Sequence, residues 1–238
     1  MSSMKKAAIV GVTGRMGAEL LGLANEFGFK VTSGLAREKK DIAGVEVVTD
    51  LDELDPDVKV VIDFSLPEST LAVAEWCQEK NVPFVSGVTG ISPEHKTVLA
   101  EVAEKIPVLW APNMSLGVAV MARMMAEFSA LNGFNFQLEE FHHTKKKDMP
   151  SGTALLLQKK LIEAVGDDIP DPISIRGGGI FGIHRVFAMG EEEMLTIEHT
   201  AMNRRVFARG AWRAARWLVD KPAGLYRIDD MLSDRLEP

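Results

Sequence analysis

Short runs of β-branched and other apolar residues alternate with amphipathic stretches along the first half of the chain. The apolar runs lie at residues 7–10, 31–35, 58–64, 83–86 and 108–110. The stretches between them have the apolar spacing of helices, at residues 16–27, 67–80 and 93–105. This alternation predicts a doubly wound parallel sheet with right-handed crossovers, an α/β fold. Ligands of such sheets bind at the carboxyl ends of the strands.

The pattern changes after residue 115. A Met-rich segment at 116–131 is helical in pattern, and a mixture of strands and one helix follows it, with strands at 134–141, 173–176, 184–189 and 194–200 and the helix at 153–165. This order is typical of an α+β domain. We therefore expect one domain over residues 1–114 and a second, smaller one over 115–203. A last helical pattern at 204–219 indicates that residues 204–238 pack back on the first domain.

Composition and charge exclude several classes of protein. The 238 residues are 46% hydrophobic and 26% charged, as in ordinary globular domains. The net charge of -7 argues against a general nucleic-acid binder. The single cysteine, Cys77, excludes an intramolecular disulfide framework and a multi-cysteine metal site, and we expect no metal. The apolar runs are too short for a membrane span or a secretory signal, which predicts a cytoplasmic protein.

A glycine-rich turn joins the first predicted strand to the first predicted helix. Glycines at these places allow a tight turn, let backbone N–H groups and the positive helix end approach a pyrophosphate, and permit close helix packing. A turn without a ligand is the alternative, but the position favours a dinucleotide-binding, Rossmann-like domain over residues 1–114. The cofactor-binding candidates in this turn are Gly11, Val12, Thr13, Gly14, Arg15 and Met16.

The end of the second predicted strand bears on the choice of cofactor. An acid that binds the ribose of NAD is expected about 20 residues beyond the glycine turn, but Ala36 stands there. Arg37 and two lysines follow, and these cations suit a 2′-phosphate. We therefore expect NADPH, with NADH possible. Two alternatives stay open: a solvated run of charges, or Glu38 in the place of the acid after a shift of two residues.

Two further loops fall at predicted strand ends, at residues 86–90 and 110–115. Plain turns would need no function, but the carboxyl edge of the sheet is where a nicotinamide would extend. The candidates for cofactor binding in these loops are Gly87, Val88, Thr89, Ala111, Pro112, Asn113 and Met114.

A basic cluster at residues 142–147 stands out in this acidic chain. His142 and His143 are adjacent, so on a strand they point to opposite faces, which makes a shared metal site unattractive. Three lysines follow, and then a helix start at Ser151, where N–H groups can bind a carboxylate or a phosphate. A solvated charge run before an ordinary helix is the alternative. Otherwise the segment combines an anion site, positive charge and titratable groups.

The same segment resembles a known family. It reads Glu140-x-His142-x-x-x-Lys146-x-Asp148-x-Pro150-Ser151-Gly152-Thr153-Ala154, which is similar to the signature of the 4-hydroxy-tetrahydrodipicolinate (dihydrodipicolinate) reductases of lysine and diaminopimelate biosynthesis. Similarity extends over nearly the whole chain. It includes the glycine turn, Asp63-Phe64-Ser65, Gly87-Val88-Thr89-Gly90, Pro112-Asn113-Met114-Ser115-x-Gly117-Val118, Phe207-Ala208-x-Gly210-Ala211 and Gly224-Leu225-Tyr226.

The resemblance implies an oxidoreductase that transfers hydride from NAD(P)H to a cyclic imine dicarboxylate. It implies that His142 donates or accepts a proton and that Lys146 donates one. Substrate binding would fall to His143, Ser151, Gly152 and Thr153. It also implies a homotetramer built through the sheet of residues 115–203. A cationic acid near the reduced ring and fixed donors for two carboxylates are what this chemistry requires.

Several positions depart from the family pattern. Ala36 replaces a usual acid, and Leu66 stands where some members carry a basic residue. Gly179, Ile183 and Gln137 occupy positions that are often acidic. Two other functions remain as alternatives, a non-catalytic NAD(P)-sensing protein and another two-domain amino-acid or sugar dehydrogenase.

Overall fold

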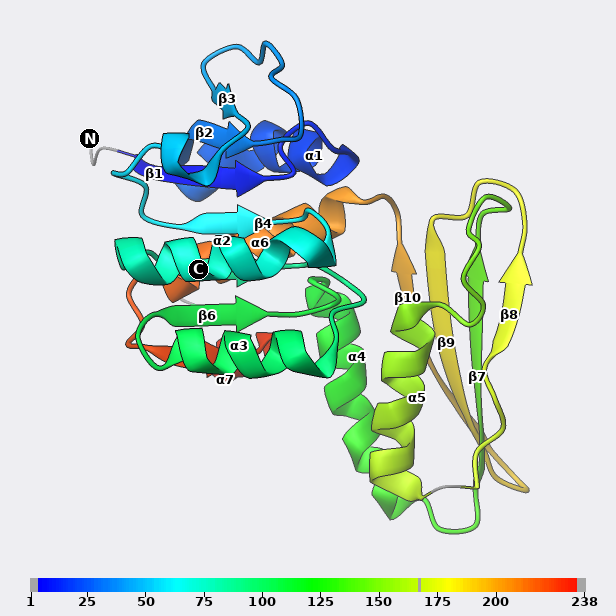
Figure 1. Ribbon diagram of the computed structural model, residues 1–238. Coiled ribbons are helices and arrows are strands. Elements are labelled where there is room, and N and C mark those ends of the chain that lie inside the picture. The colour runs from blue at the N-terminus through cyan, green and yellow to red at the C-terminus, as the bar shows by residue number, and fades with distance from the viewer. Residues whose placement is uncertain (1–3, 167, 235–238) are drawn as a thin grey trace. The chain divides into compact units, whose positions relative to one another are not determined.

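The computed structural model describes residues 4–166 and 168–234 and divides into two units. The first unit comprises the described residues up to Met114 together with those from Phe207 onward, and the second runs from Ser115 to Val206. The predicted ranges 1–114, 115–203 and 204–238 include residues 1–3, 167 and 235–238, which lie outside the described residues. The ribbon shows the elements of each unit (Figure 1).

The first unit is built on a parallel sheet in the order β11-β6-β5-β4-β1-β2-β3, which confirms the predicted Rossmann-like α/β fold. Central strands such as β1 are buried on both faces, so they appear in the sequence as continuous apolar runs. The strands are β1 (Lys5–Val10), β2 (Phe29–Leu35), β3 (Glu46–Val48), β4 (Val61–Asp63), β5 (Phe84–Ser86), β6 (Pro107–Trp110) and β11 (Gly224–Tyr226).

Helices cover this sheet. They are α1 (Arg15–Leu23), α2 (Pro67–Lys80), α3 (Pro93–Ala103), α6 (Arg205–Leu218), whose first two residues fall in the second unit, and α7 (Ile228–Ser233). Proline at the first turn starts α2 and α3, and Ser92 and His95 form a capping box on α3. The α2 and α3 helices bury Trp76, Cys77 and Leu99 against the strands.

Three predicted elements differ from the structure by more than two residues at one end. The helix expected at 16–27 ends at Leu23 and continues as a 3₁₀ turn, Ala24–Phe27. The strand expected at 58–64 is shorter, because only the residues of β4 form it. The pattern at 116–131 divides into α4 (Leu116–Met125) and a 3₁₀ turn, Ala126–Ala130. Apolar periodicity does not distinguish an α-helical end from a 3₁₀ turn, because both bury the same side chains.

The second unit has a four-stranded sheet in the order β10-β9-β7-β8. The strands are β7 (Asn135–His142), β8 (Ile173–Arg176), β9 (Gly182–Met189) and β10 (Met194–Ala201). Only β7 and β8 run parallel. One face packs on α4 and α5 (Gly152–Val165), and alternate residues of β9 are buried there. The other face carries half-exposed and exposed side chains that no described element of this unit covers.

Two kinds of feature are absent from the described residues. No helix there is both long and apolar enough to cross a membrane. Within the same residues, no group of three or more histidine, cysteine or acidic side chains is arranged to hold a metal ion.

Candidate active site

The glycine turn between β1 and α1 forms one wall of a cavity in the first unit. Gly11 has a φ of 78°, a left-handed conformation that favours glycine. A Cβ at Gly17 would lie 2.2 Å from the carbonyl oxygen of Val12. Both glycines are therefore required by the backbone, as in turns that let a helix pack closely on the preceding strand and bring its N-terminus to a ligand.

The cavity has a volume of about 930 Å³ and lies at the carboxyl ends of β1, β2 and β4. Of the predicted cofactor residues, Gly11, Thr13, Gly14 and Arg37 line it. Val12 is buried with its side chain against Gly34. Arg15 and Met16 begin α1 outside the lining. A volume of this size accommodates a large part of a dinucleotide.

The charged turn after β2 contributes both signs of charge to this cavity. Ala36 is buried, and its N–H donates to the carbonyl of Val48 at 3.0 Å. Arg37 and Lys40 are exposed along the rim, and Glu38 lines the same cavity. Lys39 pairs with Glu53 at 3.5 Å. The cations expected for a 2′-phosphate therefore lie beside the cavity, together with one acid that could bind a ribose.

A second wall comes from the turn between β4 and α2, which the sequence marked only through the family resemblance at Asp63-Phe64-Ser65 and Leu66. Ser65, Leu66, Glu68 and Ser69 line the cavity there. Asp63, fully buried at the end of β4, organises this turn. Its carboxylate accepts hydrogen bonds from Ser65 and Thr70. Burial raises the pKa of Asp63, although these hydrogen bonds oppose the rise.

The predicted loops after β5 and β6 lie at the same sheet edge but do not line the cavity. The N–H of Gly87 donates to the carbonyl of Asp63 at 2.9 Å, and a Cβ at Gly87 would lie 2.4 Å from the Phe64 ring. The Trp110 indole N–H donates to the carbonyl of Val88 at 2.9 Å. Ala111 and Met114 are buried and Asn113 half-buried, whereas Thr89 and Pro112 are exposed.

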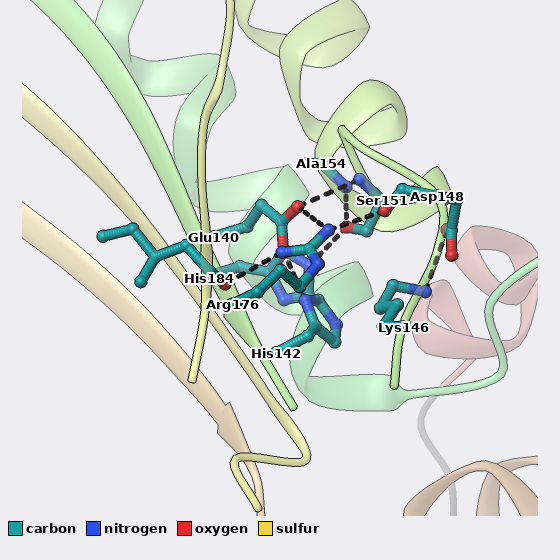
Figure 2. A network of polar contacts seen from close by, with 9 residues as sticks. Glu140, His142, Lys146, Asp148, Ser151, Ala154, Arg176 and His184 are labelled. Carbon is teal, nitrogen blue, oxygen red and sulfur yellow. Dashed lines mark hydrogen bonds and ion pairs between the residues drawn. The ribbon is translucent and has the colours of Figure 1, made fainter. Parts of the chain in front are cut away.

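The basic cluster belongs to a polar network in the second unit (Figure 2). Glu140 and His142 lie two residues apart on β7, so both face the side of the sheet that packs on α5. Arg176 on β8 and His184 on β9 reach the same place. Sequence spacing did not point to Arg176 or His184, because they lie at least 34 residues along the chain from His142.

Glu140 is fully buried, and both of its carboxylate oxygens have hydrogen-bonding partners. Its two carboxylate oxygens accept from the guanidinium of Arg176 at 2.9 and 2.7 Å, and Oε1 also accepts from the N–H of Ser151 at 3.2 Å. Oε2 contacts Nδ1 of His142. Burial would raise the pKa of Glu140, but the hydrogen bonds from Arg176 and His142 outweigh it and lower the pKa to about 2. The carboxylate is therefore ionised at neutral pH.

His142 is held as a neutral imidazole with a defined proton position. An ionised Glu140 can only accept, so Nδ1 of His142 carries the proton and Nε2 is left unprotonated. Burial lowers the pKa of His142, and the Glu140 contact opposes this effect while the charges of Lys146 and Arg176 add to it. The ring of His184 packs edge-on at 5.3 Å, and burial lowers its pKa to about 3.

Lys146 lies in the loop between β7 and α5. Its ammonium pairs with Asp148 at 2.9 Å, and its side chain is 24% exposed, whereas Lys145 and Lys147 are exposed. His143 is half-buried and its carbonyl accepts from the N–H of Lys146 at 3.0 Å. Gly177 and Gly178 lie on the adjoining loop, where the N–H of Gly177 donates to the carbonyl of His142 at 2.9 Å and the carbonyl of Gly178 accepts from the N–H of Thr144 at 3.4 Å.

The start of α5 lies beside these groups. Ser151 caps the helix, because its hydroxyl accepts from the N–H of Ala154 at 3.1 Å and lies 3.2 Å from Nε2 of His184. Gly152 is exposed and Thr153 half-buried in the first turn. The network therefore places His142, Lys146 and a helix N-terminus in one unit, which can bind an anion and transfer protons.

Comparison with known proteins identifies the family. The profile described as "Dihydrodipicolinate reductase, N-terminus" matches residues 5–114, and the profile "Dihydrodipicolinate reductase, C-terminus" matches residues 117–232. The chain belongs to the dihydrodipicolinate reductase family. This confirms the resemblance inferred from the segment at 140–154.

Individual dihydrodipicolinate reductases agree with this assignment. A "4-hydroxy-tetrahydrodipicolinate reductase" of Bdellovibrio bacteriovorus is 46% identical over 229 residues, which cover 95% of this chain and 96% of the relative. The reductase of the same name from Anaplasma marginale is 37% identical and covers 95% and 99%. A solved structure described as dipicolinate-bound dihydrodipicolinate reductase from Paenisporosarcina sp. TG-14 has the same fold, with a TM-score of 0.82, 23% identity and coverage of 94% and 97%.

Proposed function

We propose that this protein catalyses the NAD(P)H-dependent reduction of 4-hydroxy-tetrahydrodipicolinate, through dihydrodipicolinate, to tetrahydrodipicolinate in lysine and diaminopimelate biosynthesis. The observation that carries the proposal is the placement of His142, held by Glu140, and Lys146, held by Asp148, beside the N-terminus of α5 in a chain 46% identical to a reductase of that name. The protein would act in the cytoplasm, where it would draw on the reduced nicotinamide pool.

Two carboxylates of the substrate need fixed positive partners. We assign them to the first-turn N–H groups at Gly152 and Thr153 and to the side chain of His143, with Ser151 shaping the helix start. The carboxylate of Asp148 supports this assignment, because it shows that a carboxylate at this place pairs with Lys146. Burial alone would raise the pKa of Asp148. The contacts with Lys146 and with the N–H of Gly152 outweigh burial, so the pKa is lowered. A substrate carboxylate would be attracted to the same two groups, the ammonium of Lys146 and the N–H of Gly152.

Proton transfer divides between two side chains in this proposal. NAD(P)H, when bound, supplies the hydride. Lys146 then donates the proton that the reduced ring takes up, because it is a cation held within the network. His142 would act in the preceding loss of water from the 4-hydroxy substrate, where its Nε2 accepts the ring proton that leaves with the hydroxyl as water, because its Nδ1 proton is directed at Glu140 and its Nε2 can only accept. Lys145 and Lys147 raise the local concentration of an anionic substrate.

The cavity of the first unit fits the cofactor. Gly11, Gly14 and the start of α1 would hold the pyrophosphate, and Arg37 would hold a 2′-phosphate. NADPH is therefore the proposed cofactor, with NADH as a second one because Glu38 and Glu68 also reach the cavity. Val12, Thr13, Arg15 and Met16 would complete the turn, and the loops at 87–89 and 111–114 would contact the nicotinamide half.

We also propose a homotetramer built through the uncovered face of the second sheet. That face exposes apolar side chains, among them Ile173 and Ile175 at 46% and 39%. Contiguous exposed apolar side chains on a sheet are typical of an interface between chains.

The decisive experiment is a coupled assay in which the preceding synthase generates the substrate and the loss of NADPH absorbance is followed. We expect NADPH consumption that depends on the synthase product. An NAD(P)-sensing protein would bind NADPH without consuming it, and another amino-acid or sugar dehydrogenase would consume it only with a different substrate. No consumption by folded protein would reject the proposal.

A further inference from the structure

Arg176 connects the two proposed proton-transfer groups. Its side chain is only 9% exposed. One terminal nitrogen, Nη1, donates to Glu140 and to the carbonyl of Ile175, both at 2.9 Å. The other, Nη2, donates to Glu140 at 2.7 Å and to the carbonyl of Asp148 at 2.6 Å. The planar guanidinium therefore bridges β7, β8 and the loop that carries Lys146.

We propose that Arg176 is a positioning residue that fixes His142 through Glu140 and Lys146 through Asp148. The inference rests on the roles proposed above for His142 and Lys146. Nothing in the sequence motif at 140–154 includes Arg176, which comes from the next strand of the sheet.

On the His142 side, Arg176 controls the protonation of the imidazole. Its fork binds both oxygens of Glu140, so that this carboxylate stays ionised and accepts from Nδ1 of His142. Its positive charge also disfavours an imidazolium at His142. The ionised carboxylate selects the tautomer with the proton on Nδ1, and the Arg176 charge favours the neutral ring, which leaves Nε2 as a free acceptor.

On the Lys146 side, Arg176 anchors the loop. The carbonyl of Asp148 accepts from Nη2, and the carboxylate of the same residue pairs with the ammonium of Lys146. Asp148 is thus held by its backbone while its side chain holds Lys146. A lysine at position 176 could supply the charge but not the fork, because an ammonium cannot meet both Glu140 oxygens in one plane and also reach Asp148.

Several charged or titratable groups surround His142 and affect its pKa, so the test must separate the effect of Arg176 from theirs. Glu140 lies on its own strand, Arg176 on β8, His184 on β9, and the Lys146–Asp148 pair and His143 on the following loop. Glu140 is the acid in direct contact with the ring. Removal of the Arg176 charge should therefore raise the pKa of His142, because it leaves the imidazole opposite an ionised carboxylate with one cation fewer.

The experiment compares Arg176→Gln and Arg176→Lys with wild type, and with Arg209→Lys as a control. Arg209 is also paired with a glutamate, Glu26, at 2.9 Å, but on an exposed surface of the first unit. Two quantities are measured below the melting temperature of each variant. One is the NMR titration and tautomer of His142, assigned with His142→Asn, and the other is kcat and KM with the synthase-generated substrate.

We expect Arg176→Gln to raise the pKa of His142 and to lower kcat on the order of 10- to 100-fold. Arg176→Lys should keep the pKa of His142 near that of wild type yet still lower kcat, because the charge is retained and the fork is lost. Changes in KM should be smaller than those in kcat for both variants. Arg209→Lys should match wild type in every measurement.

Two results would overturn the inference. One is an unchanged His142 titration together with wild-type kcat in folded Arg176→Gln. The other is a melting temperature below that of wild type in both variants, together with wild-type kcat and a wild-type His142 titration at a temperature where the variants are folded. That result would show that Arg176 has a structural role alone. The NMR titration needs no turnover, so it stays informative if the wild-type protein fails the reductase assay.

Discussion

The ammonium of Lys146 pairs with the carboxylate of Asp148 at 2.9 Å, and this pair distinguishes Lys146 from the lysines on either side of it. Lys145 and Lys147 are exposed, whereas the Lys146 side chain is 24% exposed. The pairing holds Lys146 in the network of His142 and Glu140 (Figure 2). Three consecutive lysines of identical chemistry are therefore expected to differ sharply in function.

Lys146→Ala should reduce kcat by on the order of 100-fold or more, as expected for the loss of a general acid. Lys145→Ala is the matched control and should change kcat little, because that side chain acts only through its charge on the surface. Steady-state kinetics of both variants with the synthase-generated substrate check this prediction. Near-normal kcat in Lys146→Ala would show that the proton comes from elsewhere.

Arg37→Ala should weaken NADPH binding far more than NADH binding. The side chain lines the cavity where a 2′-phosphate would lie, and the ribose diol of NADH offers no such charge. The expected result is a higher KM for NADPH, with the KM for NADH nearly unchanged. Paired kinetics with both cofactors measure the difference, and Arg213→Ala, an exposed arginine of α6, serves as the control. An equal loss with both cofactors would reject a 2′-phosphate role.

Much of the fold could be predicted because the signals for its strands and helices lie within short stretches of the sequence. Buried parallel strands such as β1 and β6 appear as apolar runs, and proline starts α2 and α3. The strands β3 and β11 have three residues each and lie at the two edges of the sheet, where β11 buries no residue and β3 buries only Val47 and Val48. Strands this short can be detected only where they lie in a longer apolar run, as β4 does.

The site could be predicted only where it is contiguous in sequence. The spacing of His142 and Lys146 is visible within one loop, but Arg176 meets Glu140 only through the pairing of β7 with β8. One signal was present: strand alternation places Arg176 on the inward face, beside the half-buried Ser174, and a charged residue at such a position requires a partner. Likewise, Ser65 and Glu68 line the cavity from a turn without a glycine motif, where the buried carboxylate of Asp63 accepts from the N–H of Ser65.

The stability of the protein should fall as the pH drops below about 6.5, partly because of His184. Burial lowers the folded-state pKa of this residue to about 3 from an ordinary 6.5. Between these values the unfolded chain binds a proton that the folded chain does not, so the contribution is fully present above 6.5 and is lost toward 3. The slope from one such group is at most about 1.4 kcal/mol per pH unit.

His184→Gln tests this assignment. Urea unfolding of the variant should show a flatter dependence of the unfolding free energy on pH between 6.5 and 3 than wild type, even if the variant is less stable at pH 7. The amide can still bond to Ser151, so the cap on α5 is kept. Parallel curves for the two proteins would mean that His184 is protonated in the folded state.

Gly210→Ala should destabilise the first unit. A Cβ at this position of α6 would lie 1.6 Å from the carbonyl oxygen of Met114, a contact that only a backbone shift can relieve. Overpacking of this kind costs about 1–3 kcal/mol or more. Thermal unfolding should show a lower melting temperature than wild type, whereas Arg216→Ala, at an exposed position of the same helix, should unfold close to wild type. Equal melting temperatures would mean that α6 shifts freely.

Ile173→Lys should break the proposed tetramer into smaller species without unfolding the chain. Ile173 lies on the uncovered face of the second sheet and is 46% exposed in the single chain. Burying a lysine there in a contact between copies would be costly, whereas within one chain it would stand opposite Glu139 on β7, a favourable cross-strand pair.

Light scattering of wild type and variant measures the assembly, with circular dichroism as the check of folding. Leu225→Lys is the matched control, because Leu225 is an apolar residue of β11 that is 48% exposed in the other unit. We expect wild type and Leu225→Lys to have the same molar mass and Ile173→Lys a smaller one. If Ile173→Lys stays folded and keeps the wild-type mass, this face of the sheet is not where the copies meet.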